Sequence, residues 1–305
     1  MPEGADTKPR AAGSKRAKSS KKRLRPDLAT LGGLLFALAG IVGGLLLEKG
    51  SINDIAQGTA ALIVLGGTLG AVLVTTPLGV VRRAFRALGS VLFERKSATA
   101  EVIQDLIGFA AKARKQGIVS LEGDAETVPD AFLKKALNLA VDGTDLQEFR
   151  KMMEIDIELT QQKAEAEARV WECAGGYAPT VGIIGAVMGL IQVMKHLEDI
   201  KEVGHGIAVS FVATVYGVAL ANLFFLPAAG KLRARMREMV LVQEMVLEGI
   251  IGIVEGLNPT LIRLKLESYC PAPEPPKTAA AAAGEKDLPQ QQGRKGVAPD
   301  PTPAR

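Results

Sequence analysis

The segment Tyr177–Met194, YAPTVGIIGAVMGLIQVM, contains no charged residue and has the length of a membrane-spanning helix. A helix needs about 20 mostly apolar residues to cross the hydrocarbon core of a bilayer. Three more uncharged segments have the same character: Leu28–Leu47, Ile55–Thr76 and Ile207–Ala229. Short polar connectors, Glu48–Ser51 and His196–His205, separate the two members of each pair. The sequence therefore predicts two helical hairpins that together contain four transmembrane helices.

Basic residues lie on the same side of all four predicted spans. Nine Lys or Arg residues fall within residues 1–25, ahead of the first span. Arg82, Arg83 and Arg86 follow the second span, and Lys231, Arg233, Arg235 and Arg237 follow the fourth. The positive-inside rule places such flanks in the cytoplasm. We therefore expect a multi-pass protein of the bacterial inner (cytoplasmic) membrane with both termini in the cytoplasm. A basic tail can also bind nucleic acid, but its place directly ahead of a span favours anionic lipid, and no nucleic-acid partner is expected.

The block between the second and third spans has a helical pattern throughout. Ala98–Ala113 places its apolar residues along one helix face, and Gly117 ends that pattern. Pro129 is expected to open a second helix, and Asp145 or Thr144 to cap a third that continues to about Cys173. A further helix is expected to follow the fourth span to about Gly256, with a break at Asn258 and Pro259.

These patterns predict an all-α membrane protein with four transmembrane helices, arranged 2+2, and a helical cytoplasmic domain between spans 2 and 3. The expected divisions are a basic disordered extension (1–26), transmembrane hairpin 1 (27–77), the cytoplasmic domain (78–176), transmembrane hairpin 2 (177–229), a cytoplasmic C-terminal helix (230–270) and a disordered tail (271–305). The tail is rich in Pro, Ala and Gln and lacks the apolar residues that a core requires.

Motifs of soluble enzymes are absent from the sequence. It contains no phosphate-binding P-loop, no GxSxG motif and no zinc-ligand spacing. The two histidines, His196 and His205, flank a short loop, and the two cysteines, Cys173 and Cys270, lie far apart. We expect the cysteines to be reduced and structural. The sequence thus predicts a protein that is not an enzyme and holds no cofactor and no metal.

The predicted spans contain no Asp, Glu, Lys, Arg or His. A transporter that acts alone usually needs an ionisable group inside the membrane, so an ion carrier for this chain is expected on another chain. The i, i+4 pairs Gly66/Gly70 and Gly185/Gly189 allow close contact between helices. Pro179 and Pro227 lie near span ends, where they serve either as helix-end residues or as hinges.

Several ordered motifs resemble the MotA/PomA family of flagellar stator proteins. Ala178–Leu190 (APTVGIIGAVMGL) resembles the third span of that family. Ala113–Glu122 (ARKQGIVSLE) resembles its rotor-facing cytoplasmic motif. Further similar stretches are Gly204–Val209, Ala213–Gly217, Ala221–Pro227, Val141–Asp145, Glu248–Ile250 and Glu255–Pro259. The resemblance extends from about Asp27 to Pro271.

The resemblance implies a flagellar motor stator subunit. Several copies, a pentamer in the family pattern, would surround a dimer of a MotB-like single-span protein that supplies the membrane Asp. Pro179 and Pro227 would couple ion passage to movement of the cytoplasmic domain. Arg114, Lys115 and Glu122 would contact the rotor switch ring, through exposed pairs worth about 0–1 kcal/mol each.

Four residues are expected to line the ion path: Thr180, Ala186, Thr214 and Tyr216. Sodium-type relatives have Thr where this sequence has Ala186, so one oxygen ligand for a dehydrated Na⁺ is missing. The resemblance therefore favours H⁺ over Na⁺ as the transported ion. The alternative function is that of an ExbB/TolQ-like proton-driven energiser of another envelope process, but those relatives have one span before their cytoplasmic domain and this chain has two.

Overall fold

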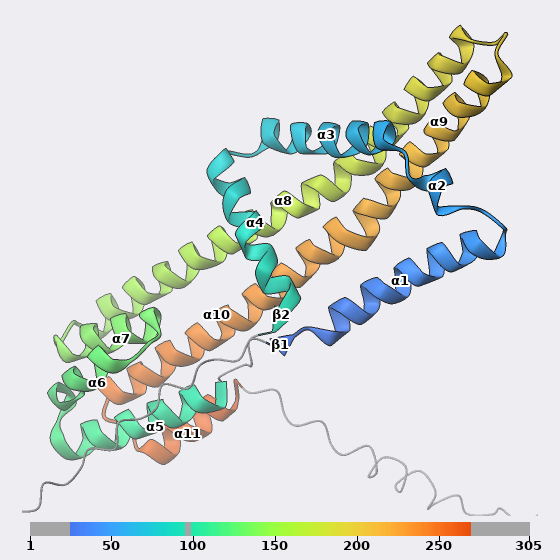
Figure 1. The fold of residues 1–305 in the computed structure, drawn as a ribbon. Coiled ribbons are helices and arrows are strands. Elements are labelled where there is room, and N and C mark those ends of the chain that lie inside the picture. Colours follow the sequence, from blue (N-terminus) through green and yellow to red (C-terminus); the bar gives the residue numbers. More distant parts are fainter. Residues whose placement is uncertain (1–24, 95–98, 270–305) are drawn as a thin grey trace, which may run out of the picture.

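The computed structural model describes residues 25–94 and 99–269, and nearly all of them are helical (Figure 1). In chain order the elements are β1 (Arg25–Pro26), α1 (Leu28–Leu47), α2 (Ile52–Ile55), α3 (Gly58–Thr75), α4 (Leu78–Leu92), β2 (Phe93–Glu94), α5 (Thr99–Gln116), η1 (Ile118–Leu121), α6 (Glu122–Thr127), α7 (Ala131–Val141), α8 (Leu146–Lys195), α9 (Ile200–Leu220), the π-helical turn η2 (Ala221–Phe225), α10 (Leu226–Val254) and α11 (Pro259–Glu267). The predicted all-α fold class is confirmed. The two-residue strands β1 and β2, which pair antiparallel, were not expected.

Four helices are long and apolar enough to cross a membrane, as predicted. Two are α1 and α3, and the other two belong to the longer stretches Leu146–Lys195 and Ile200–Val254. These long helices extend well beyond the apolar segments and carry the chain to the opposite end of the molecule (Figure 1). The third and fourth spans therefore continue directly into cytoplasmic helices, across the boundaries expected at 177 and 229.

Short polar side chains determine where the helices begin. The Asp145 carboxylate accepts from the backbone N–H groups of Gln147 and Glu148 and caps α8, as one of the two expected caps. Asp130 caps α7 by accepting from Leu133 N–H, so this helix begins two residues after the expected Pro129. The expected breaks are present, because Gly117 has a φ of 82°, a left-handed conformation that favours glycine, and Asn258 caps α11 ahead of Pro259.

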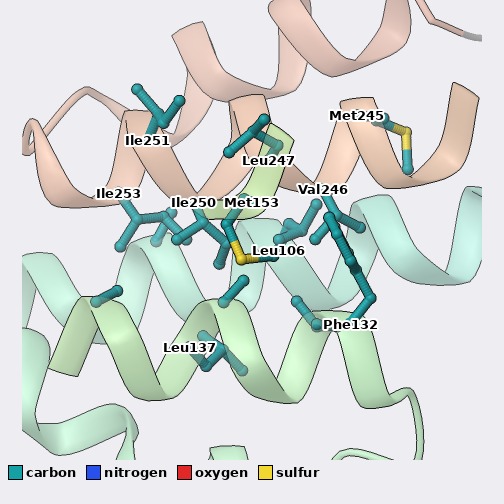
Figure 2. Close-up of a cluster of buried hydrophobic side chains, with 14 of the residues drawn as sticks. Leu106, Phe132, Leu137, Met153, Met245, Val246, Leu247, Ile250, Ile251 and Ile253 are labelled. Carbon is teal, nitrogen blue, oxygen red and sulfur yellow. The ribbon is translucent and has the colours of Figure 1, made fainter. Parts of the chain in front are cut away.

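The cytoplasmic end has its own hydrophobic core, formed by α5, α7, α8, α10 and α11 with the short η1 and α6. Leu106, Met153 and Ile250 meet near its centre (Figure 2), and each is fully buried or nearly so. The core thus packs the C-terminal part of α10 against helices α5, α7 and α8, which lie far earlier in the sequence. This core makes the cytoplasmic part a packed helical domain rather than a set of loops.

The predicted basic extension and disordered tail lie almost entirely outside the described residues, which begin at Arg25 and end at Tyr269. Cys270 also lies outside them, whereas Cys173 is half-buried in α8 and is a free thiol.

Candidate functional site

Helices α8 and α9 approach each other closely because both carry glycines at their contact. Three glycines of α8 are buried against α9: Gly182, Gly185 and Gly189. On the α9 side, a Cβ added to Gly217 would lie 2.5 Å from the carbonyl oxygen of Ala178. Such a contact leaves no room for any side chain. The predicted role of the Gly185/Gly189 spacing in close helix contact therefore agrees with the packing of this hairpin.

At the other predicted glycine pair, Gly66 and Gly70 of α3, an added Cβ would meet no atom within 4 Å among the described residues. Instead, the adjacent Gly67 faces α8, where a Cβ would lie 2.6 Å from a methyl group of Val181. Helix α3 packs through a different face, formed by Ala60, Val64, Thr68 and Val72. The i, i+4 spacing alone did not reveal which face of α3 meets its neighbours.

Two of the predicted path residues, Ala186 and Thr214, lie at the contact between α8 and α9. They are connected through Ser210, whose Oγ lies 2.8 Å from the Ala186 carbonyl oxygen and 3.0 Å from that of Gly206. Thr214 donates its hydroxyl to the Ser210 carbonyl at 3.2 Å. Ser210 is buried, and sequence reasoning did not place it on the path. The signal that could have identified Ser210 is a hydroxyl-bearing residue within a glycine-rich hairpin.

The other two predicted path residues lie elsewhere. Tyr216 donates its hydroxyl to the carbonyl oxygen of Ile55 at 2.6 Å and so joins α9 to the end of the short helix α2, which precedes α3. Thr180 is exposed on α8 and donates to the Tyr177 carbonyl at 2.8 Å. The structure therefore groups Ala186 and Thr214 and leaves Tyr216 and Thr180 at separate positions within this single chain.

The two prolines lie on either side of one tight helix contact. Pro179 lies inside α8, and Pro227 is the second residue of α10, directly after the π-helical turn η2. Gly175, one turn before Pro179, packs on Leu226, the residue before Pro227, and a Cβ there would lie 2.6 Å from the leucine side chain. Because proline lacks a backbone N–H, each removes a helix hydrogen bond at this level. Both prolines therefore lie close to the contact between α8 and the start of α10.

An aromatic cluster next to the prolines joins three segments. Trp171 of α8 donates its indole N–H to the carbonyl oxygen of Ala84 in α4, at 3.3 Å. The Trp171 ring lies edge-on to Phe85 and Phe224 and is stacked on Phe225, with ring centroids 4.9 to 6.1 Å apart. Trp171 is the only tryptophan of the chain, and sequence reasoning did not single it out.

Ion pairs hold the long helices together beside this cluster. Arg233 of α10 donates to Glu165 at 2.9 Å and to Glu172 at 2.5 Å, both on α8. The hydrogen bond from Arg233 lowers the pKa of the Glu172 carboxyl. Asp27 caps α1 and pairs with Lys231 of α10. These contacts tie α1 and α8 to α10 near the ends of the spans.

The predicted rotor-contact residues lie at the end of the molecule opposite the hairpin loop of α8 and α9 (Figure 1). Arg114 and Lys115 occupy the last turn of α5, and Glu122 begins α6 after the turn at Gly117. All three side chains are exposed. Arg114 also lines a cavity of about 350 Å³ with apolar walls that include Ile118 and Leu257. The three residues are thus brought to one exposed tip of the cytoplasmic domain.

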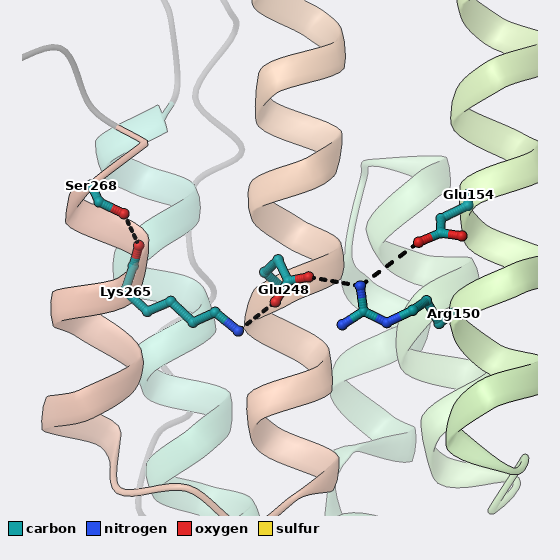
Figure 3. A network of polar contacts seen from close by, with 5 residues as sticks. All are labelled: Arg150, Glu154, Glu248, Lys265 and Ser268. Carbon is teal, nitrogen blue, oxygen red and sulfur yellow. Dashed lines mark hydrogen bonds and ion pairs between the residues drawn. The ribbon is translucent and has the colours of Figure 1, made fainter.

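A network of ion pairs joins α8, α10 and α11 within the same cytoplasmic domain. Glu248 of α10 lies between Lys265 of α11 and Arg150 of α8 (Figure 3), with Arg150 Nη1 3.0 Å from the carboxylate. Arg150 also lies 3.7 Å from Glu154. Burial would raise the pKa of Glu248, but the hydrogen bond and charge of Lys265, together with Arg150, lower that pKa overall. These ion pairs therefore connect α8, α10 and α11 with one another.

No group of three or more His, Cys, Asp or Glu side chains with the geometry of a metal site occurs in the described ranges 25–94 and 99–269.

Comparison with known families matches two regions of the chain. Residues 31–117 match the model of the motility protein A N-terminal region. Residues 124–245 match that of the MotA/TolQ/ExbB proton channel family. Together these matches cover both predicted hairpins and the domain between them.

Curated relatives are similar over nearly their whole length. Motility protein A of Bacillus subtilis (strain 168) is 35% identical over 265 residues, which are 85% of this chain and 98% of the relative. Chemotaxis protein PomA of Vibrio alginolyticus is 32% identical over 243 residues, which are 80% of this chain and 95% of PomA.

Solved structures agree with these relationships. The structure of C. jejuni MotAB matches with a TM-score of 0.76 and 32% identity, over 82% of this chain and 98% of that one. The flagellar MotAB stator complex from Bacillus subtilis matches with a TM-score of 0.73 and 35% identity, over 80% and 96%. This chain therefore belongs to the motility protein A (MotA/PomA) family, the flagellar stator members of the MotA/TolQ/ExbB proton channel family.

Proposed function

We propose that several copies of this chain form a ring around a dimer of a MotB-like partner, and that the ring turns proton flow into torque on the rotor. The observation that carries this proposal is the absence of Asp, Glu, Lys, Arg and His from the four predicted spans. A channel built from these helices alone has no group to bind and release a proton within the membrane. The partner supplies that carboxylate, in keeping with the similarity to solved MotAB complexes.

The exposed surface of the membrane part supports a ring. No residue of α1 is buried within the chain, although α1 is a full-length span. The outward residues of the α8 and α9 hairpin, among them Ile183, Val187 and Phe211, are also more than half exposed. Neighbouring copies, the partner and lipid can cover these faces. Five copies is the number that the family resemblance implies.

Pro179 and Pro227 are proposed to be the joints of the coupling. They lie where α8 and α10 leave the glycine-packed hairpin and enter the cytoplasm. On the cytoplasmic side of the prolines, both helices run without interruption to the cytoplasmic core. A small change of angle at the prolines is therefore carried to the tip as a displacement of the whole domain.

The tip residues Arg114, Lys115 and Glu122 are proposed to contact the rotor switch ring. Their exposure and their place at the end of the rigid domain support this assignment. Exposed charge pairs contribute about 0–1 kcal/mol each and break readily, which suits repeated contact with a moving partner.

Protons are proposed as the transported ion, along a path bordered by Thr180, Ala186, Thr214 and Tyr216. Ala186 contributes a methyl group and no side-chain oxygen. The hydroxyls near it belong to Ser210 and Thr214. A path with Ala186 offers a dehydrated sodium ion one side-chain oxygen fewer than a path with Thr at that position.

The proposed orientation has both termini, residues 78–176 and residues 230–270 in the cytoplasm. The basic residues after the second and fourth spans support it. The match of residues 31–117 to the motility protein A N-terminal region favours the stator over the ExbB/TolQ-like alternative, because this region contains the two spans that precede the cytoplasmic domain.

The decisive experiment expresses the chain with its single-span partner in a host that lacks stators. We expect a stable complex with more copies of this chain than of the partner by native mass spectrometry, and restored swimming. A partner whose membrane Asp is replaced by Asn is expected to assemble without restoring motility. A stable monomer that does not bind the partner, or swimming that survives a protonophore, would contradict the proposal.

A further inference from the structure

We propose that helix α4 is a binding site for anionic phospholipid, with Arg82 and Arg86 as the ligands of the lipid phosphate. The proposal concerns the membrane surface and does not depend on the stator function. It arises from the three different faces that this 15-residue helix presents.

One face of α4 packs on the protein. Val81 and Ala84 are 6% and 0% exposed and belong to a cluster with Trp171 and Phe225. The Trp171 indole N–H bonds the carbonyl of Ala84, which fixes the rotation of α4 about its own axis. The orientation of the remaining faces is therefore determined by this contact.

The second face is apolar and exposed. Leu78 and Phe85, seven residues apart and so on the same side of the helix, are 71% and 48% exposed. Only Thr76 and Pro77 separate α4 from the end of the spanning helix α3, whose Val74 is 88% exposed. The exposed apolar surface thus continues from a transmembrane span onto α4, which places this face at the boundary of the acyl chains.

The third face is basic and adjoins the apolar one. Arg82 and Arg86 lie four residues apart on the side of Leu78 and Phe85 that faces away from the protein, and both are exposed. Arg83 lies further round the helix, where it pairs with Glu167 of α8 at 3.4 Å. An apolar edge bordered by arginines is the pattern of helices that lie in the membrane interface and bind anionic lipid.

The bilayer surface is the occupant that these faces fit. A bound lipid would receive two guanidinium groups at its phosphate and two apolar side chains beside its acyl chains. Because Trp171 connects α4 to α8 eight residues before Pro179, the lipid would also hold the segment of α8 that carries this proline.

The test uses Trp171, the only tryptophan, as a reporter of lipid close to α4. The full-length chain is reconstituted into vesicles of phosphatidylcholine and phosphatidylglycerol, with bromine atoms on the acyl chains of one lipid at a time. Bromine quenches tryptophan fluorescence at short range without needing direct contact, so a buried indole such as Trp171 still reports on lipid beside α4, and the ratio of quenching by the two lipids measures their relative binding. A second reporter, Gly89→Trp in a Trp171→Phe chain, places the indole on the exposed side of α4, where a Cβ meets no atom within 4 Å.

We expect phosphatidylglycerol to be preferred about 10- to 30-fold in low salt, since each of the two arginines near an anionic surface adds a factor of about five. Arg82→Gln with Arg86→Gln is expected to bring the ratio close to one. The matched control, Lys151→Gln with Arg263→Gln, removes the same charge from exposed positions on the cytoplasmic domain and is expected to keep the preference.

Three results would overturn the proposal. The first is equal quenching by both lipids at both reporters in the unaltered chain. The second is a preference that survives in the Arg82→Gln, Arg86→Gln chain. The third is a preference that disappears only when the Lys and Arg residues of 1–24 are replaced by Gln, which would assign the lipid to the basic extension instead.

Discussion

Gly217 of α9 lies directly against the carbonyl group of Ala178 in α8, one residue before Pro179. A Cβ at this glycine would lie 2.5 Å from the Ala178 carbonyl oxygen and 3.2 Å from the Cα of Gly182. The neighbouring atoms are backbone, so they cannot move aside as a flexible side chain would. The spacing of the two helices that border the proposed ion path is therefore set by a missing side chain.

Gly217→Ala is expected to force α8 and α9 apart and to destabilise the hairpin by about 1–3 kcal/mol. Swimming should be lost, and the thermal unfolding midpoint of the detergent-solubilised complex should fall. Gly176→Ala is the matched control, because this exposed glycine of α8 has no atom within 4 Å of an added Cβ. Equal behaviour of the two variants would show that the close approach is not needed.

Pro179→Ala and Pro227→Ala are each expected to leave expression and partner binding unchanged while most of the torque is lost. Alanine restores a helix hydrogen bond and stiffens the proposed joint. Torque is read from the rotation speed of tethered cells. Pro129→Ala, an exposed proline of the cytoplasmic domain outside the long helices, serves as the control and is expected to rotate normally. Full torque in both joint variants would exclude the hinge role.

Arg114→Glu combined with Glu122→Lys is expected to abolish rotation without changing stability, because both side chains are exposed. The double variant should still assemble with the partner and should still conduct protons across the membrane. Arg263→Glu reverses a charge on α11 and is expected to have no effect. If the double variant turns the rotor at full speed, the contact must lie elsewhere on the domain.

Motility is expected to stop on addition of a protonophore and to be independent of external Na⁺. The physical reason is the absence of a side-chain oxygen at Ala186. The measurement is swimming speed in media where K⁺ replaces Na⁺. Motility that follows the external Na⁺ concentration would reverse the assignment of the ion.

Glu248→Gln is expected to destabilise the cytoplasmic domain by about 1 kcal/mol at neutral pH, since it removes a charged hydrogen-bond acceptor from Lys265 and Arg150. The pKa of Glu248 is lowered in the folded protein. Its stabilisation is therefore present above the unfolded pKa of about 4.3 and is lost as the pH falls toward the folded value.

Thermal unfolding of both proteins across the acidic range checks this sign. The difference between their midpoints should be constant above about pH 5 and should shrink as the pH falls below the unfolded pKa of about 4.3. Glu126→Gln, at an exposed position of α6, is the control. A difference that grows toward low pH would contradict the role of the charge.

The sequence was sufficient for the four spans and for several helix ends because these depend on local properties. An uncharged segment of about 20 residues has few alternatives to crossing a bilayer. Capping by Asp145 and the break at Gly117 also depend only on neighbouring residues. The start of α7 was expected two positions too early, since Pro129 was taken as its first residue and the helix begins at Ala131, after the cap Asp130.

The grouping of the site residues could not be read from the sequence in the same way. Helical spacing suggested Gly66 and Gly70 as contact residues, yet Gly67 meets the neighbouring helix. Likewise, Ser210 and Trp171 became visible only through their bonds to Ala186 and Ala84, 24 and 87 residues away. Periodicity identifies a face but not the element that packs on it.

The sequence by itself determined that this chain is a four-span membrane protein whose spans contain no Asp, Glu, Lys, Arg or His. That result follows from the free-energy cost of placing charge in hydrocarbon, which acts on each segment independently. Only the tertiary structure decided that Pro179 and Pro227 lie on either side of one contact, and that Gly217 sets the spacing of α8 and α9. Those relationships depend on close packing between segments far apart in the chain, which local sequence does not specify.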